Sequence, residues 1–139
     1  MTLDAKNYVG RVRDPKWERD LARELRLLPE AMRLQFVKDL LDVHLVVALD
    51  LARKCLSQRE SLESLLEFGL QEANPSTMQD WLKCVLPGLG ARRLVRCLHG
   101  HLNDYPQAVE SARYWLPGLL TKADRSKVDL KGLKRLQPA

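Results

Sequence analysis

The tetrapeptide Leu-Pro-Gly-Leu occurs twice in this 139-residue chain, at residues 86–89 and again 30 positions later at residues 116–119. Each copy follows a run whose apolar residues recur with the spacing of an amphipathic helix. Proline lacks the N–H that an interior helical position donates, and glycine is favoured just past a helix end. The pattern therefore predicts two helices that end or bend at Pro87 and Pro117.

Helical spacing extends through most of the chain, and the alternation typical of β-strands is essentially absent. Start signals divide it into helices: Asp14 precedes a proline, Asp42 precedes an apolar run, and Ser57 with Glu60 forms a capping box. The sequence predicts an all-α fold of seven to eight helices in stacked antiparallel hairpins. The expected helices span residues 15–28, 30–41, 43–56, 57–73, 74–87, 91–102 and 106–116, with a short last helix over residues 126–136.

The expected organisation is an N-terminal arm over residues 1–13, a helical domain over residues 14–120 and a basic C-terminal segment over residues 121–139. That last segment holds six basic and two acidic residues, and it is expected to form a short capping helix. A chain of this length is typical of one domain. Within the helical domain, residues 43–56 are apolar nearly all round, so they are the predicted central helix.

Composition places the chain among intracellular globular proteins. Hydrophobic residues make up 45% and charged residues 29%, and the longest apolar run, residues 45–49, is far shorter than a membrane span. The N-terminal residues contain no apolar stretch typical of a signal peptide. The three cysteines form no close pair, which favours reduced thiols and a cytoplasmic location.

A longer internal repeat accompanies the tetrapeptides. Residues 28–56 align with residues 74–102 at an offset of 46, pairing proline with proline at the start and apolar with apolar residues thereafter. Residues 83–102 resemble a HEAT repeat, with Leu-Pro near the end of the first helix and the pair Val95 and Arg96 opening the second. The turn departs from that family, because Gly90 and its neighbours stand where an aspartate is usual.

The resemblance implies a short HEAT/armadillo-like superhelix, in which each hairpin buries its apolar face against the next. It also implies a binding role, because such arrays present extended surfaces to other macromolecules. The alternative is an irregular helical bundle whose Pro-Gly pairs coincide by chance.

Residues with the chemistry of a metal or catalytic site are present but poorly spaced. Cys84, Cys97, His99 and His101 include no close cysteine pair, and the two histidines point to different sides of a helix. The carboxylates of Glu60, Glu63 and Glu67 share a helix face without histidine partners, which is typical of a solvated surface. No catalytic triad or phosphate-binding loop is found. We therefore expect no enzyme activity, no metal and no cofactor. The remaining alternative is a helical enzyme whose site residues are scattered along the chain, and a deep pocket containing His44, His99 or the three glutamates would reveal it.

The predicted helix over residues 91–102 carries a cationic ridge opposite its apolar face. Arg92, Arg96 and His99 fall within about 60° of one another at 100° per residue, and Arg93 lies near the same end. Arginines in the first turns oppose the helix dipole, at a cost of a few tenths of a kcal/mol. This arrangement indicates either contact with an anion or an acidic partner, or a solvated face that pairs with Asp80 or Glu110 on neighbouring helices.

The basic C-terminal segment supplies a second set of cations. Lys127, Lys131, Lys134 and Arg135 would line one stripe of a helix. Such a stripe could contact nucleic acid, an acidic protein or anionic lipid, or it could be the polar outer face of a capping helix. The preferred function, which the HEAT/armadillo-like resemblance implies, is a protein-interaction or scaffold module with another protein, of acidic surface, as partner. The alternative is a nucleic-acid-binding domain that grips the phosphate backbone. No membrane span is predicted, and the exposed end helices of a short array would allow a homodimer.

Five aromatic side chains are candidate binding hot spots if exposed, although each is expected in the core. They are Trp17, Trp81, Tyr105, Tyr114 and Trp115.

Overall fold

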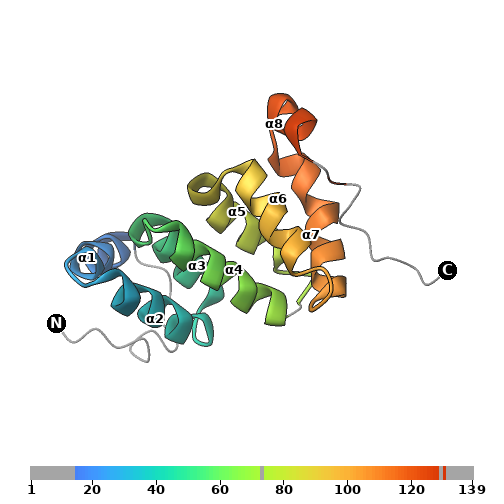
Figure 1. The fold of residues 1–139 in the computed structure, drawn as a ribbon. Helices are drawn as coiled ribbons and strands as arrows, with labels where there is room; N and C mark the ends of the chain where they lie inside the picture. The colour runs from blue at the N-terminus through green and yellow to red at the C-terminus, as the bar shows by residue number, and fades with distance from the viewer. Residues whose placement is uncertain (1–14, 73, 129, 131–139) are drawn as a thin grey trace. The chain divides into compact units, whose positions relative to one another are not determined.

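A computed structural model describes residues 15–72, 74–128 and 130, and the arm predicted at residues 1–13 lies outside them. In these ranges the chain is all-α, with eight helices and no strand, which confirms the predicted fold class (Figure 1). The helices are α1 (Pro15–Arg26), α2 (Glu30–Leu41), α3 (Leu45–Cys55), α4 (Arg59–Glu72), α5 (Met78–Leu89), α6 (Ala91–Gly100), α7 (Pro106–Leu119) and α8 (Lys122–Lys127). They divide into two compact units, unit 1 up to Leu62 and unit 2 from Glu63, with the boundary inside α4.

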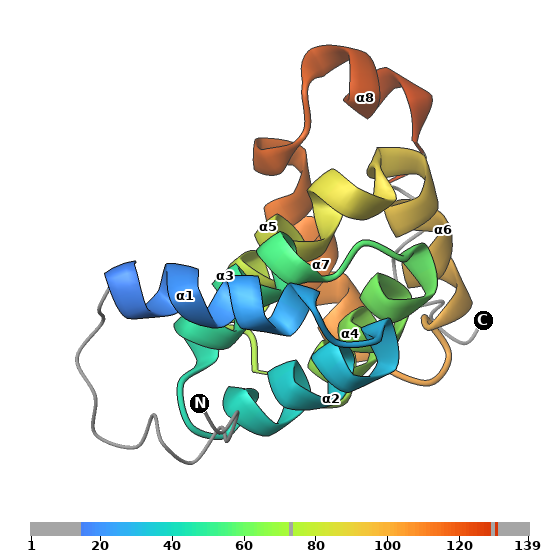
Figure 2. The same cartoon turned by 90° about the vertical axis from the view of Figure 1, so that its left-hand side faces the viewer.

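In unit 1, α3 packs against both α1 and α2, as the two views show (Figures 1 and 2). Six of its eleven residues are buried, which confirms that this apolar segment forms a central element of its unit. The apolar side chains buried by the three helices are Leu21, Ala22, Leu25, Phe36, Val37, Leu40, Leu41, Val47, Ala48, Leu49, Leu51, Ala52 and Cys55. Burial of this apolar surface is the main favourable term in the stability of unit 1.

A single guanidinium ties the helix ends of unit 1 together. Arg33, in the first turn of α2, donates from Nη2 to the carbonyl of Arg26 (2.7 Å) and from Nε to that of Leu28 (2.8 Å). Its Nη1 donates to the carbonyl of Cys55 at the end of α3 (2.9 Å). The last carbonyls of a helix have no intrahelical donor, so Arg33 satisfies such groups at the ends of both α1 and α3.

Two predicted helix starts in unit 1 are wrong in detail. Asp42 ends α2, and the cap of α3 is His44, whose Nδ1 accepts from the N–H of Val47 (3.4 Å). The predicted capping box has the carboxylate of Glu60 accepting a hydrogen bond from the backbone N–H of Ser57, but the carboxylate of Glu30 accepts it instead (2.7 Å). Both errors arise because the chain offers more than one polar side chain for the same backbone group.

In unit 2, α5 packs against α6 and α7. Because α5 and α7 carry the Leu-Pro-Gly-Leu tetrapeptides, the two copies lie on helices that contact each other (Figure 1). The residues buried along α5, α6 and α7 are Met78, Trp81, Leu82, Cys84, Val85, Leu89, Leu94, Val95, Leu98, Ala108, Val109, Ala112 and Leu116.

The tetrapeptides form the last turns of their helices and do not stop them at proline. Pro87 lies inside α5, which continues to Leu89, and Pro117 lies inside α7, which continues to Leu119. After α5 the chain turns in a single residue, Gly90, at φ 80° and ψ 158°. Only glycine adopts this region of backbone space readily, so Gly90 makes the short turn between α5 and α6 feasible.

Trp81 is the largest side chain buried in unit 2, with 2% of its surface exposed. It lies against Gly69 of α4 so closely that a Cβ added there would stand 2.6 Å from the indole ring. The ring of Phe68 packs beside it at a tilted angle, with the ring centroids 6.3 Å apart. The absence of a side chain at position 69 therefore lets α4 and α5 of unit 2 approach each other.

The last helix lies earlier than predicted. Thr121 caps α8 by accepting from the N–H of Asp124 (3.1 Å), and Val128 is already extended. Beyond it, the carbonyl of Leu130 accepts a hydrogen bond from Nε of Arg113 on α7 (2.9 Å). None of the helices in the described ranges has the length and apolarity that a membrane crossing requires.

Candidate functional site

Three of the four residues of the predicted cationic ridge are exposed on α6. Arg92, Arg96 and His99 lie at positions i, i+4 and i+7, so they form one stripe about 10 Å long at 1.5 Å per residue. The opposite face, with Leu94, Val95 and Leu98, is buried. Burial of that face therefore directs the stripe toward solvent.

Arg93 has a different environment. Its Nε donates to Oε1 of Glu63 on α4, and both side chains are about one-third exposed (35% and 33%). A pair this accessible is worth at most about 1 kcal/mol, but it compensates the charge of Arg93 within unit 2. The structure thus separates Arg93 from the ridge in which the sequence placed it, and it gives Glu63 a partner where a solvated face was expected.

The same carboxylate affects a neighbouring thiol. Burial raises the pKa of Cys97, and Glu63 raises it further by charge and by a hydrogen bond. Arg93 and Arg96 oppose this effect without reversing it. Cys97 is therefore a protonated, weakly nucleophilic thiol at neutral pH, not an activated nucleophile.

The start of α6 is electrostatically unusual. Its cap, Gly90, offers no side-chain hydrogen bond, and its first turn contains no acidic residue. Arg92 and Arg93 stand there instead, where the helix dipole favours negative charge. This end of α6 is consequently more positive than a typical helix start.

Helix α8 adds cations beside α6. It packs against α6, and both views draw it beyond the end of α6 that follows the α5–α6 turn (Figures 1 and 2). Lys122, Arg125 and Lys127 of α8 are exposed. Of the C-terminal cations predicted from sequence, Lys127 therefore lies at the surface, and Lys131, Lys134 and Arg135 lie outside the described residues. We call the exposed residues Arg92, Arg96, His99, Lys122, Arg125 and Lys127 the α6–α8 cationic face.

The sequence places Lys122 and Arg125 in the basic C-terminal segment, but no helix is predicted over them. The predicted last helix begins at Ser126, although the hydroxyl of that residue donates to the carbonyl of Ala123 inside α8 (2.7 Å). The overlooked signal was Thr121 with an aspartate three positions later, which is also a capping pattern.

Groupings typical of metal centres do not occur in the part of the chain that the structure describes: no three His, Cys, Asp or Glu side chains converge there. Of the residues considered for a metal, Cys84 is buried in the core of unit 2, Cys97 is half-buried and His99 is exposed. Glu60 is exposed and Glu67 half-buried.

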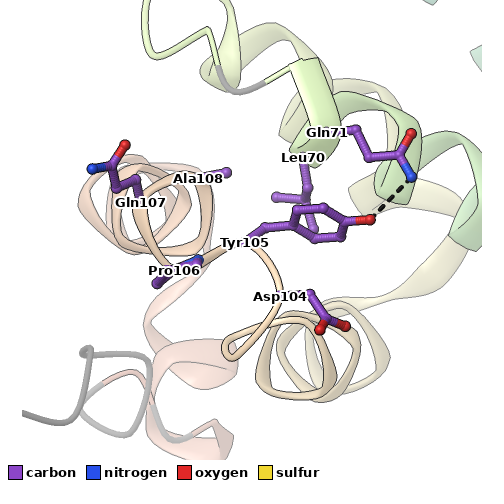
Figure 3. Close-up of a pocket in the computed structure, with 7 residues that line it drawn as sticks. All are labelled: Leu70, Gln71, Asp104, Tyr105, Pro106, Gln107 and Ala108. Carbon is purple, nitrogen blue, oxygen red and sulfur yellow. Dashed lines mark hydrogen bonds between the residues drawn. The ribbon is translucent and has the colours of Figure 1, made fainter.

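A surface pocket of about 300 Å³ lies around Tyr105 in unit 2 (Figure 3). Leu70 and Gln71 at the end of α4 form one wall, and residues 106–108 in the first turn of α7 form another. Nε2 of Gln71 donates a hydrogen bond to the hydroxyl of Tyr105 (3.0 Å). In Figure 3, Asp104 and the hydroxyl end of Tyr105 lie toward the same side of the pocket, and Gln107 points the other way.

The aromatic residues divide between core and surface. Trp81 is buried as predicted, and Trp17, Tyr105 and Trp115 are partly exposed. The prediction for Tyr114 is wrong: this side chain is 76% exposed and packs edge-on against Trp115, with the ring centroids 5.1 Å apart.

No protein-family model, curated protein or solved structure matches this chain.

Proposed function

We propose that this protein is a non-catalytic interaction module that binds an acidic segment of another protein through the α6–α8 cationic face. The observation that carries this proposal is the packing of α8 against α6, which brings Lys122, Arg125 and Lys127 to the helix that exposes Arg92 and Arg96. Clustered charges of one sign attract a complementary surface and raise the rate of encounter with it.

The proposed partner contact is weak and sensitive to salt. The cations are exposed, so each ion pair with a partner contributes no more than about 1 kcal/mol. Affinity then depends on several pairs forming together, and it falls as salt screens them. Such behaviour suits a scaffold that holds its partner transiently.

A HEAT/armadillo-like arrangement is part of the proposal. The first residue of α3 lies 46 positions before Ala91, the first residue of α6. The first residue of α2, moved by the same 46 positions, falls two residues before the start of α5. Contact between α5 and α7 is also what neighbouring repeats require in order to bury their apolar faces. Both observations support a repeat of helical hairpins.

Nucleic-acid binding is the second candidate, favoured by the same cations and by a sequence pI near 9.3. The two candidates differ in the anion that the cations would contact, the carboxylates of an acidic segment or the phosphates of a nucleic-acid backbone. Of the aromatic side chains described in unit 2, Tyr114 is the one exposed to a large degree, so the nucleic-acid candidate is one of backbone contact without stacking of several bases.

The proposed location is the cytoplasm, a proposal supported by the three cysteines, none of which forms a disulfide. Self-association into a homodimer remains a prediction, and sedimentation velocity at several protein concentrations would test it.

The deciding experiment measures binding of a fluorescein-labelled ten-residue polyglutamate peptide and of a labelled 30-base-pair duplex by anisotropy, from 50 to 300 mM NaCl. The test variant is Arg92→Glu/Arg96→Glu. Its matched control is Arg19→Glu/Arg23→Glu, which changes two exposed arginines with the same spacing on α1 and shifts the net charge equally.

We expect the peptide to bind at low salt, with affinity reduced about tenfold or more by the α6 variant and about twofold or less by the α1 control, as the loss of two ion pairs requires. Equal losses in the two variants would show that net charge alone attracts the peptide, and the proposed face would be wrong. Tighter binding of the duplex, with a steep dependence on salt that the α6 variant removes, would favour the nucleic-acid function.

A further inference from the structure

The pocket around Tyr105 has the size and lining of a binding site for a side chain. Its volume of about 300 Å³ lies at the lower end of the range for ligand pockets. Leu70 in one wall, and Pro106 and Ala108 in the other, give the pocket apolar lining. Such a surface suits the hydrocarbon part of a ligand.

Tyr105 is held in a defined orientation at the centre of this pocket. The amide of Gln71 donates to its hydroxyl, and the ring of His101 packs against it with the centroids 5.7 Å apart. The Tyr105 side chain is nevertheless partly exposed, so some of its ring surface is available to a ligand. A fixed aromatic ring attracts a cation placed over its face.

The charge at this pocket is negative. Among the described residues that line it, Asp104 carries the only formal charge, and its side chain is exposed. The pocket wall at Leu70 and Gln71 is the C-terminal end of α4, where the helix dipole adds partial negative charge. An anionic ligand would be repelled by Asp104, whereas a cation would be attracted by the carboxylate and by the ring.

We propose that this pocket receives a lysine or arginine side chain from a partner protein. The aliphatic stem of that side chain lies along Leu70 and the ring of Tyr105, and its cationic head extends past the ring to the exposed Asp104, whose carboxylate points away from the ring (Figure 3). Long basic side chains place an apolar stem and a charged head in this way. The inference is independent of the α6–α8 cationic face, since none of the residues of that face lines this pocket.

The test is a titration of the full ¹⁵N-labelled chain, followed by amide chemical shifts, with three probes: Nα-acetyl-lysine methylamide, Nα-acetyl-arginine methylamide and the uncharged Nα-acetyl-norleucine methylamide. Lysine and norleucine probes share an apolar stem and differ in the charged head. Asp104→Asn removes the carboxylate charge at the pocket. Asp80→Asn is the matched control, because Asp80 is also an exposed aspartate of unit 2 and does not line this pocket.

We expect saturable shifts of the Gln71, Asp104, Tyr105 and Gln107 amides with both basic probes, at millimolar affinity. Norleucine should bind about fivefold more weakly, and Asp104→Asn should reduce lysine affinity about fivefold, as the loss of one exposed ion pair implies. Asp80→Asn should bind like the unmodified chain. The proposal is overturned if norleucine binds as well as lysine, if Asp104→Asn leaves affinity unchanged, or if these four amides do not shift.

Discussion

Residues 44 and 90 occupy equivalent places in the two units, 46 positions apart, and each is the N-cap of a helix with a different backbone and side chain. Each precedes the first residue of a helix, Leu45 of α3 and Ala91 of α6. His44 has an extended backbone, and its ring accepts a hydrogen bond from the helix. Gly90 offers no side chain and turns the chain through a positive φ. Similar helical pairs can therefore be joined by side-chain capping or by backbone geometry.

The difference extends through each unit. In unit 1, connections of three residues or more leave room for polar side chains, and Arg33 and Glu30 bind the ends of neighbouring elements. In unit 2, the single residue between α5 and α6 leaves no such room, whereas the longer connections before α5 and before α7 hold polar contacts, such as the hydrogen bond between Gln71 and Tyr105. We therefore expect the helix ends of unit 1 to depend on polar groups, and the α5–α6 connection and the contact of Gly69 with Trp81 in unit 2 to depend on a glycine.

The largest expected effect is that of Arg33→Ala. Three carbonyls lose a charged donor at helix ends, and hydrogen bonds to charged groups are worth more than neutral ones, so we expect a loss of about 2–4 kcal/mol in the free energy of unfolding. Urea unfolding gives the total change. Hydrogen exchange followed by mass spectrometry locates it, and protection should fall in α1 and α3 more than in α6. Arg53→Ala, which truncates an exposed arginine of α3, is the control and should change stability by about 0.5 kcal/mol or less.

Gly69→Ala tests the apolar contact of unit 2. The new methyl group would overlap the ring of Trp81, and overpacking of a buried site costs about 1–3 kcal/mol. Gly100→Ala, which adds a methyl group where no atom lies within 4 Å, is the matched glycine substitution and should be neutral or slightly stabilising. If both variants unfold at the same urea concentration, α4 and α5 do not approach as closely as described.

Gly90→Ala tests the cost of backbone strain at the α5–α6 turn without steric overlap. No atom lies within 4 Å of the added Cβ, so the expected loss of about 1–3 kcal/mol comes from the backbone conformation alone. Thermal unfolding followed by circular dichroism measures it. Stability equal to that of the unmodified chain would mean that the α5–α6 turn adopts another backbone conformation.

Most of the fold was predictable because helix formation follows the local spacing of apolar residues. All eight helices overlap predicted ones, although α8 does so by two residues only. The helix starts were less predictable, because a cap depends on competition between polar groups. Glu30 reaches Ser57 across 27 positions of sequence, and no local pattern distinguishes it from Glu60.

Only the part of the candidate site that follows from helical spacing was predictable from the sequence. Exposure of Arg92, Arg96 and His99 follows from the helical spacing of the buried residues opposite them. The pairing of Arg93 with Glu63, 30 positions apart, depends on how α4 and α6 lie in unit 2 and has no local signal. The pocket around Tyr105 likewise combines segments more than 30 positions apart.

His44→Ala should have a smaller effect than Gly90→Ala. It removes one capping hydrogen bond of 3.4 Å, so the expected loss is about 0.5–1 kcal/mol, measured by urea unfolding. His44→Asn supplies another cap residue and should restore most of the loss. A loss above that of Gly90→Ala would reverse the ranking of the two connections.

The smallest effect concerns one thiol in each unit. Burial raises the pKa of both Cys55 and Cys97, so the folded state favours the protonated form of each. Their contribution to stability is therefore fully present below the pKa of an unfolded thiol and is lost as pH rises through the folded pKa. The free energy of unfolding should fall as pH rises above the pKa of an unfolded thiol, about 8.5, and Cys55→Ala should reduce that slope.

The two thiols also differ in access. Cys55 is 2% exposed and donates weakly to the carbonyl of Ala22, whereas Cys97 is half-buried on α6. Iodoacetamide at pH 8, followed by peptide mass spectrometry, should modify Cys97 about tenfold faster than Cys55, since the thiolate must be both formed and accessible. Equal rates would mean that opening of unit 1 exposes Cys55 as readily as Cys97 is exposed on α6. The polar contacts at the helix ends of unit 1 would then be weaker restraints than the apolar packing of α4 and α5.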